Sequence, residues 1–148
     1  RNLETQINEL PPELEALKDT IKIDVTDEGL RIQLIDNNNE AIFKRGTDEL
    51  TDHAKLALQL VADIAINLPN PVSVTGHTGS SEGVENIWEL SVNRANTIRR
   101  GLTRNGLPGQ RFEAVVCVAN TEPLIPDNVD SPQNRRMTIV LLRQAPLN

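Results

Sequence analysis

The chain has few of the residues from which disulfides, metal sites and stacking surfaces are built. Its 148 residues include one cysteine, two histidines, one tryptophan, two phenylalanines and no tyrosine. A single cysteine excludes an internal disulfide framework and a cysteine-based zinc site, and two histidines exclude a histidine-rich metal cluster. So few aromatic side chains also argue against a platform on which nucleic-acid bases or sugars stack. We therefore expect no metal and no other cofactor.

Neither charge nor hydropathy indicates a nucleic-acid or membrane partner. Fifteen Lys and Arg stand against 21 Asp and Glu, a formal net charge of −6, whereas nucleic-acid binding needs a basic surface. The longest apolar candidate, residues 56–66, contains Gln59 and Asp63 and is shorter than the roughly 18 residues of a membrane span. With 38% hydrophobic and 24% charged residues, the chain is typical of one globular domain. Because it starts without Met, we expect it to be a piece of a longer protein.

Hydrophobic periodicity predicts a mixed α and β fold. Period-two alternation and continuous apolar runs predict strands at residues 23–26, 30–35, 72–76, 112–118 and 137–142. Apolar residues at helical spacing predict helices from about 51 to 68 and from about 87 to 105. Apolar runs like those of the last two strands are typical of strands that are covered on both faces or placed centrally. We therefore expect an α/β (α+β) fold of two layers, with helices packed on one sheet.

The N-terminal stretch is predicted to be a helical linker region of residues 1–21, followed by the domain at residues 22–148. Leu3, Ile7 and Leu10 share one helical stripe, and Pro11-Pro12 must break or restart that helix. The stripe either packs on its own domain or pairs with a partner chain, and both interpretations remain open.

Arg94 is the most unusual residue of the second predicted helix. On a wheel of 3.6 residues per turn, it falls within the apolar stripe that holds Leu90, Ile98 and Leu102. A buried guanidinium is costly unless it is paired. One interpretation is a structural arginine that pairs with an internal acid or extends to a rim. The other is an arginine at the mouth of a cleft that binds a ligand carboxylate in bidentate geometry.

The segment Gly76-His77-Thr78-Gly79 follows a predicted strand and leads towards this helix. Ligands of open sheets bind beyond the carboxyl ends of strands, and a helix N-terminus favours an anion. The segment is therefore either part of a binding site or a plain glycine-rich connection. No Gly-Lys-Ser/Thr follows, which excludes a Walker-type phosphate loop. No Gly-x-Ser-x-Gly elbow is present, and we expect no enzymatic activity.

Three short motifs together resemble one family. Residues 86–95, with Asn86, Leu90-Ser91 and Arg94-Ala95, resemble the helix motif of OmpA-like peptidoglycan-binding domains. Gly76-His77-Thr78 resembles the start of their Gly-His-Thr-Asp segment, and Asn134-Arg135-Arg136 resembles their Asn-Arg-Arg signature. Residues 27–34, then Phe43 and Glu49-Leu50, are more narrowly similar to the periplasmic wall-anchoring domains of flagellar stator B subunits. The resemblance covers about residues 13–143.

The resemblance implies a periplasmic OmpA-like fold with a mixed sheet that binds peptidoglycan without a covalent step. The implied ligand is the diaminopimelate of the stem peptide. Arg94 would take a ligand carboxylate and Arg136 would lie near the same cleft; the other implied site residues are Asn86, Leu90, His77, Thr78 and Gly79. The resemblance also implies a homodimer, held in the inner membrane by an N-terminal helix that is absent here. Through that segment the protein would contact the stator A subunit.

Position 79 departs from the family pattern. The family aspartate that completes the binding clamp lies fifteen residues before the motif arginine, where this chain has Gly79. A lost charge-assisted bond is worth on the order of 1.5–3 kcal/mol, or roughly ten- to a hundredfold in affinity. Glu82 or Glu85 substitutes for the aspartate, the ligand is bound differently, or binding is weak or lost. Two other functions also remain open: another OmpA-like anchor (an outer-membrane protein or a peptidoglycan-associated lipoprotein) and a non-binding protein-interaction scaffold.

Overall fold

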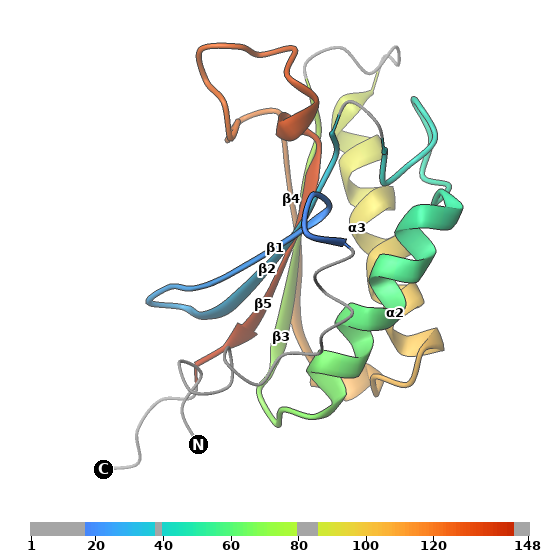
Figure 1. The fold of residues 1–148 in the computed structure, drawn as a ribbon, viewed down its shortest axis with the longest axis vertical. Helices are drawn as coiled ribbons and strands as arrows, with labels where there is room; N and C mark the ends of the chain where they lie inside the picture. The colour runs from blue at the N-terminus through green and yellow to red at the C-terminus, as the bar shows by residue number, and fades with distance from the viewer. Residues whose placement is uncertain (1–16, 38–39, 80–85, 144–148) are drawn as a thin grey trace.

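A computed structural model of the chain describes residues 17–37, 40–79 and 86–143. These residues form two layers, a five-stranded sheet and two α-helices that lie against one of its faces (Figure 1). The strands are β1 (Ile21–Val25), β2 (Gly29–Ile35), β3 (Val72–His77), β4 (Phe112–Ala119) and β5 (Arg136–Leu142). The helices are α2 (Asp52–Ile66) and α3 (Ile87–Arg104), with short 3-10 turns η3 (Gly109–Arg111) and η4 (Pro132–Asn134). The predicted α+β sandwich is confirmed.

The order of the strands brings three carboxyl ends to one end of the sheet. The order is β1-β2-β5-β3-β4. Strands β2 and β3 both pair antiparallel with β5, and β3 pairs in parallel with β4. Strands β2, β3 and β4 therefore point the same way, and the sheet is mixed. Ligands of such sheets bind beyond the carboxyl ends of the strands, so this end is the place to look for a site.

The core lies between the sheet and the two helices. Along β2, Leu30, Ile32 and Leu34 are fully buried, and they pair across the ladder with Leu141, Ile139 and Met137 of β5. These side chains form one cluster with the apolar faces of the helices, including Val61, Ile98 and Leu102. The apolar side chains that recur every two residues in the strands and every 3.6 residues in the helices thus pack together in one layer, as expected of a two-layer domain.

Strand β4 corrects one of our predictions. Its apolar sequence is typical of a covered or central strand, but β4 lies at the edge of the sheet. Val115 and Val116 are 37% and 42% exposed. Strand β5, predicted on the same grounds, is the central strand. An apolar run indicates that a segment forms a strand with apolar side chains on both faces. It does not indicate which strands will lie beside that strand in the sheet.

The predicted linker of residues 1–21 lies mostly outside the described residues. Of its described part, Ile21 belongs to β1 and Leu17 packs against the core.

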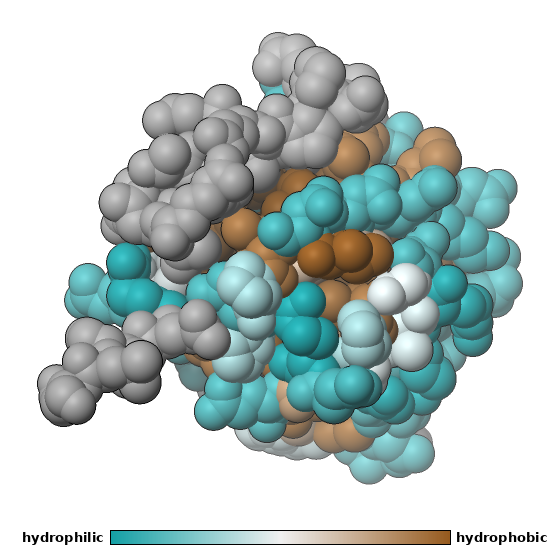
Figure 2. Space-filling view, turned by 90° about the horizontal axis from the view of Figure 1, so that it is seen from below, coloured by the Kyte–Doolittle hydropathy of each residue, from teal (hydrophilic) through white to brown (hydrophobic). Residues whose placement is uncertain are grey.

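The end of the molecule opposite the carboxyl ends of β2, β3 and β4 carries small hydrophobic patches between polar residues (Figure 2). Within the described ranges, no helix combines the length and the apolar character needed to cross a membrane.

Candidate functional site

A cavity of about 280 Å³ lies at the carboxyl end of the parallel strands, and we call it the cleft. Its lining residues are Asp36, Ala41, Phe43, Arg45, Arg94, Asp130 and Arg135. They come from three distant parts of the chain: the segment after β2, helix α3, and the segment between β4 and β5. Three guanidinium groups and two carboxylates meet here, so the cleft is locally cationic in a chain of net charge −6. A cavity of about 10 Å³ adjoins it, and His77, Arg136 and Met137 help to line it.

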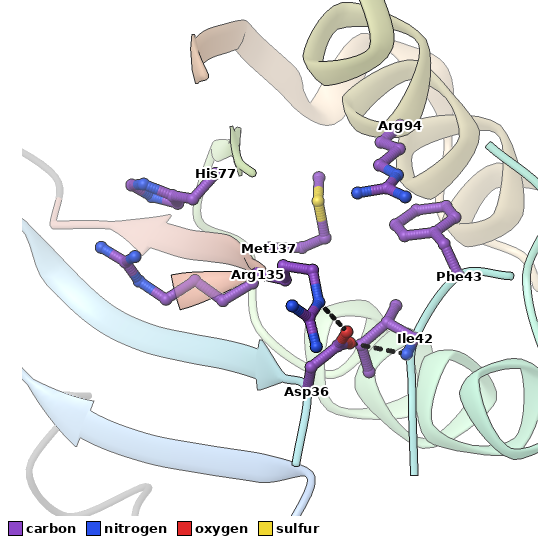
Figure 3. Close-up of a pocket in the computed structure, with 8 residues that line it drawn as sticks. Asp36, Ile42, Phe43, His77, Arg94, Arg135 and Met137 are labelled. Carbon is purple, nitrogen blue, oxygen red and sulfur yellow. Dashed lines mark hydrogen bonds and ion pairs between the residues drawn. The ribbon is translucent and has the colours of Figure 1, made fainter. Parts of the chain in front are cut away.

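Arg94 is both buried and placed at the cleft. Its residue is 4% exposed, and its Nε donates a hydrogen bond to the backbone oxygen of Thr47 at 2.8 Å. Its guanidinium carbon lies 4.9 Å from the centre of the Phe43 ring, within cation–π range (Figure 3). Arg94 is therefore held as a structural arginine would be and lies where a ligand-binding arginine would lie; that it binds a ligand carboxylate stays a prediction. Protein groups hold the side chain, and its guanidinium borders an open cavity.

Close packing between β3 and α3 fixes the height of Arg94 above the sheet. The Ser91 hydroxyl donates to the backbone oxygen of Gly76 at 3.0 Å and accepts from the backbone N–H of Ala119 at 3.3 Å. A Cβ on Gly76 would lie 2.9 Å from the backbone oxygen of Ser91, so a side chain at position 76 would push the helix away. The glycine of one motif and the serine of another thus bind α3 to the strand ends, one turn before Arg94.

Asn86 and Glu89 cap the start of helix α3. The Asn86 side-chain oxygen accepts from the backbone N–H of Glu89 at 3.0 Å, and its amide donates to the Glu89 carboxylate at 3.2 Å. Asn86 is exposed and Leu90 is buried, and neither lines the cleft. Asn86 therefore caps α3, and the assignment of Asn86 and Leu90 to the binding site stays a prediction.

An ion pair between the buried Asp36 and the partly exposed Arg135 forms one wall of the cleft. The Arg135 Nε donates to Asp36 Oδ2 at 2.8 Å, and the Ile42 backbone N–H donates to Asp36 Oδ1 at 2.7 Å. The side chain of Asp36 is 7% exposed and that of Arg135 is 31% exposed. Burial raises the pKa of Asp36 above its ordinary value, although both hydrogen bonds favour the carboxylate. The acid is thus held inside, while its arginine partner reaches the cleft.

The three residues of the Asn-Arg-Arg segment do three different things. Arg135 lines the cleft, whereas Arg136 borders only the small cavity. Arg136 Nε donates to Gln33 Oε1 at 3.2 Å and its Nη2 donates to the backbone oxygen of Glu122 at 2.9 Å. Consecutive residues at the start of a strand point to opposite faces, so only one of the two arginines can face the cleft. We predicted that Arg136 lies near the cleft, and it borders the small cavity that adjoins the cleft, whereas Arg135 lines the cleft itself.

Asn134 organises the loop before β5. Its side-chain amide donates to the backbone oxygens of Ile125, Asn128 and Val129 at 3.3, 2.9 and 3.2 Å. Its side-chain oxygen accepts from the Ile125 N–H at 2.7 Å. Asn134 is buried at the centre of these four bonds. They fix the loop that carries Asp130 to the cleft.

His77 and Thr78 lie behind the cleft. His77 Nε2 is 3.2 Å from the Thr138 hydroxyl, whereas its buried Nδ1 has no hydrogen-bond partner among the described residues. Burial, and secondarily the charge of Arg136, lowers the pKa of His77 to about 4, so the imidazole is neutral at pH 7. Thr78 donates its backbone N–H to Ala119 at 2.8 Å. His77 borders the small cavity, and neither residue lines the cleft.

Gly79 is buried against Arg135. A Cβ built on Gly79 would lie 3.1 Å from Arg135 Cγ and 3.6 Å from its Nη1. The carboxylate that the family pattern has here would therefore lie beside Arg135. Glu82 and Glu85, which we considered as substitutes, fall outside the described residues.

Sequence reasoning missed several residues that line the cleft: Asp36, Arg45, Asp130 and Arg135. Only Arg135 carried a local signal, because it adjoins the arginine that we named. Phe43 entered through the resemblance alone. Within the part of the chain that the structure describes, no group of three or more His, Cys, Asp and Glu side chains is placed to hold a metal ion.

Comparison with known proteins agrees with this architecture. The OmpA family profile matches residues 42–136. The chain is 36% identical over 144 residues to Motility protein B of Escherichia coli K12, an alignment covering 94% of this chain and 47% of that protein. The chain thus spans about half the length of this relative.

Two solved structures share the fold. The periplasmic domain of Helicobacter pylori MotB superposes with a TM-score of 0.72 at 21% identity, over 84% of this chain and 80% of that one. The cell wall anchor of the T6SS from Pseudomonas aeruginosa gives a TM-score of 0.72 at 21% identity, over 89% and 94%. Because the family profile extends over well more than half of the sequence and includes β3, α3 and the Asn-Arg-Arg segment, the chain belongs to the OmpA family.

Proposed function

We propose that this chain binds peptidoglycan non-covalently through the cleft and so anchors a flagellar motor stator to the cell wall. One observation carries the proposal: Arg94 is almost fully buried, yet its guanidinium borders an open cavity at the carboxyl ends of the strands. A charged group is costly to bury, so a side chain held at this place by Thr47 and Phe43 is well suited to an external carboxylate.

The chemistry of the cleft fits the stem peptide of peptidoglycan. Diaminopimelate offers carboxylates and an ammonium group. Arg94 and Arg135 would each take a carboxylate oxygen, because a guanidinium matches a carboxylate in bidentate geometry. Asp36 holds Arg135 by its Nε, which fixes the direction of the guanidinium. Binding of this kind forms and breaks no covalent bond.

Gly79 makes this binding weaker than an aspartate at the same position would. The position faces Arg135, and a carboxylate there would both orient that arginine and attract the ammonium group of the ligand. The loss corresponds to roughly a tenfold or greater decrease in affinity, from charge-assisted bonds of about 1.5–3 kcal/mol.

The remaining parts of the proposal concern the longer protein. Its wall-binding domain would lie in the periplasm, and an inner-membrane helix before residue 1 would join it to the stator A subunit. Two copies would form a homodimer. The similarity to Motility protein B over 94% of this chain supports this assignment over another wall anchor of the same family.

Co-sedimentation with purified sacculi tests the proposal. The wild-type chain should pellet with sacculi, and Arg94→Ala should reduce the bound fraction at least tenfold. Arg100→Ala is the matched control, because Arg100 lies on the same helix, is exposed and does not line the cleft. If Arg94→Ala binds sacculi as well as Arg100→Ala does, the cleft is not the wall-binding site. If wild type does not bind at all, a protein-interaction scaffold is the better description.

A further inference from the structure

A second cavity, of about 480 Å³, lies on the face of the sheet opposite the helices, and we call it the side cavity. Its lining residues include Lys22, Gln33, Ile35, Asp36, Leu124 and Gln133. Because Leu34 of β2 is buried in the core, its neighbours Gln33 and Ile35 point to the opposite face. The turn between β1 and β2 and the segment between β4 and β5 both project from that side of the sheet (Figure 1). Asp36 lines both the side cavity and the cleft.

Gln33 brings a free hydrogen-bond donor to the side cavity. Its Oε1 accepts from Arg136 Nε at 3.2 Å and from the Thr138 hydroxyl at 3.3 Å. Because a guanidinium can only donate, the orientation of the amide is fixed. Both partners belong to β5 on one side of β2, so the Nε2 group is directed towards β1 on the other side. Gln33 is 8% exposed, and its Nε2 has no hydrogen-bond partner among the described residues.

The charges around the side cavity balance one another. Asp19 and Lys22 contribute one charge of each sign, and Asp36 is paired with Arg135 at 2.8 Å. The cleft differs, because three arginines line it against two acids. The described lining of the side cavity therefore favours a neutral ligand over an anion or a cation.

The other groups of the side cavity offer hydrogen bonds and apolar contact together. Gln33 and Gln133 provide two carboxamides, and Ile35 and Leu124 provide apolar surface. An N-acetylated sugar is complementary to this set, because it carries hydroxyl groups, an amide carbonyl and an acetyl methyl group without charge. The volume of the cavity lies in the range of small-molecule sites. Amide hydrogen bonds of this kind need no aromatic platform.

We propose that the side cavity binds an N-acetylated sugar of the glycan strand, with Gln33 Nε2 donating to the carbonyl oxygen of the acetamido group. This inference rests on the proposed function, because peptidoglycan joins such sugars covalently to its stem peptide. Asp36 separates the two cavities. A stem peptide in the cleft would therefore bring its sugar close to the side cavity, and the two sites would hold different parts of one polymer.

Three small ligands separate the two sites. N,N′-diacetylchitobiose has two acetamido groups and no carboxylate that Arg94 could bind. Cellobiose has the same β-1,4-linked rings without acetamido groups, and meso-diaminopimelate is the ligand of the cleft. NMR titration of the isotope-labelled chain measures these weak affinities. Diacetylchitobiose should shift the amide signals of Gln33 and Gln133, and it should bind about fivefold more tightly than cellobiose.

Two variants remove the proposed contacts. Gln33→Glu keeps an oxygen for Arg136 and Thr138 but replaces the free donor by an acceptor, so it should weaken diacetylchitobiose binding about fivefold. Gln133→Ala changes an exposed side chain and should weaken it about threefold. Both should bind diaminopimelate within about twofold of wild type. Gln110→Glu is the matched control, because it adds the same charge at an exposed glutamine that lines neither cavity.

The outcomes distinguish this inference from the proposed function. If diacetylchitobiose binds no more tightly than cellobiose, or if Gln33→Glu and Gln133→Ala bind it as Gln110→Glu does, the side cavity is not a sugar site. Binding of diaminopimelate would still support the cleft. If Arg94→Ala weakens diacetylchitobiose binding and Gln33→Glu does not, the sugar lies in the cleft and the inference is wrong. If Gln33→Glu loses the sugar while Arg94→Ala still binds sacculi as wild type does, the side cavity stands and the proposed role of the cleft fails.

Discussion

Arg135 and Asp36 are 99 positions apart in the sequence, and their side chains meet at 2.8 Å in the wall of the cleft. The pair joins the end of β2 to the start of β5. Burial raises the pKa of Asp36, so the fold favours the protonated acid more than the unfolded chain does. The contribution of Asp36 to stability is therefore present below its ordinary pKa of 3.8 and is lost as pH rises through its higher folded value.

Asp36→Asn should remove this pH dependence. The asparagine oxygen can still accept from the Ile42 N–H, and Arg135 is exposed enough to remain hydrated. The wild type should lose stability relative to Asp36→Asn as pH rises above 3.8, measured by urea unfolding from pH 3.5 to pH 7. Asp36→Ala is the contrasting variant. It leaves the Ile42 N–H without an acceptor and should cost about 1–3 kcal/mol. Equal stability of the Ala and Asn variants would contradict this account.

His77 should give the opposite dependence at mildly acidic pH. Its pKa is lowered from 6.5 to about 4, so the unfolded chain binds a proton that the folded chain excludes. The stabilisation is present above pH 6.5 and is lost as pH falls towards 4. It amounts to about 3 kcal/mol at most, by the conversion of about 1.4 kcal/mol per pKa unit. His77→Gln should flatten this part of the curve of unfolding free energy against pH. An unchanged slope in His77→Gln would contradict this account.

Gly79→Asp should strengthen binding to diaminopimelate by about tenfold. The new Cβ would lie near the Arg135 side chain, and the carboxylate would add a charge-assisted contact at the cleft. Only a flexible side chain has to move to make room. The matched control is Gly109→Asp, which adds the same charge where a Cβ meets nothing within 4 Å. Calorimetry or NMR titration measures the gain in affinity. If both variants bind more tightly by the same factor, the gain comes from the added net charge and not from a contact at the cleft.

Gly76→Ala should destabilise the domain by about 1–3 kcal/mol, as overpacking of a well-packed contact does. The added methyl group would meet the Ser91 backbone oxygen at 2.9 Å, and a helix backbone cannot rotate out of the way. Urea unfolding measures the loss. Affinity for sacculi should fall as well, because α3 carries Arg94. Gly109→Ala should leave both quantities within about 0.5 kcal/mol of wild type, and an equally mild effect of Gly76→Ala would refute the close-packing argument.

The fold could be predicted from the sequence because its elements follow simple periodicities. The apolar stripe of α3 already placed Arg94 among buried residues, and the structure confirms this position at 4% exposure. The edge position of β4 could not be predicted, because it depends on which strands pair. Hydrophobic periodicity identifies a strand but does not identify the strands with which it pairs.

The candidate site was predictable only in part. Asp36 and Asp130 have no local pattern that distinguishes them from the other carboxylates, and they become site residues only when the segments after β2 and before β5 meet. The choice between Arg135 and Arg136 depends on the residue at which β5 begins, since a shift of one residue exchanges the two faces. Gly76 and Ser91 were visible as parts of motifs, but their contact appears only when α3 lies on β3.

Arg135 directly precedes β5, the middle strand, which is hydrogen-bonded to β2 on one side and to β3 on the other. Under the proposed function, a ligand bound to this arginine would pull on β5. A pull along the strand axis loads the two antiparallel ladders of β5 in shear. In this geometry the inter-strand hydrogen bonds must break together and not one after another. If the cleft holds a ligand under load, its place at the end of the central strand gives the domain a mechanical resistance that the same residues on an edge strand would lack.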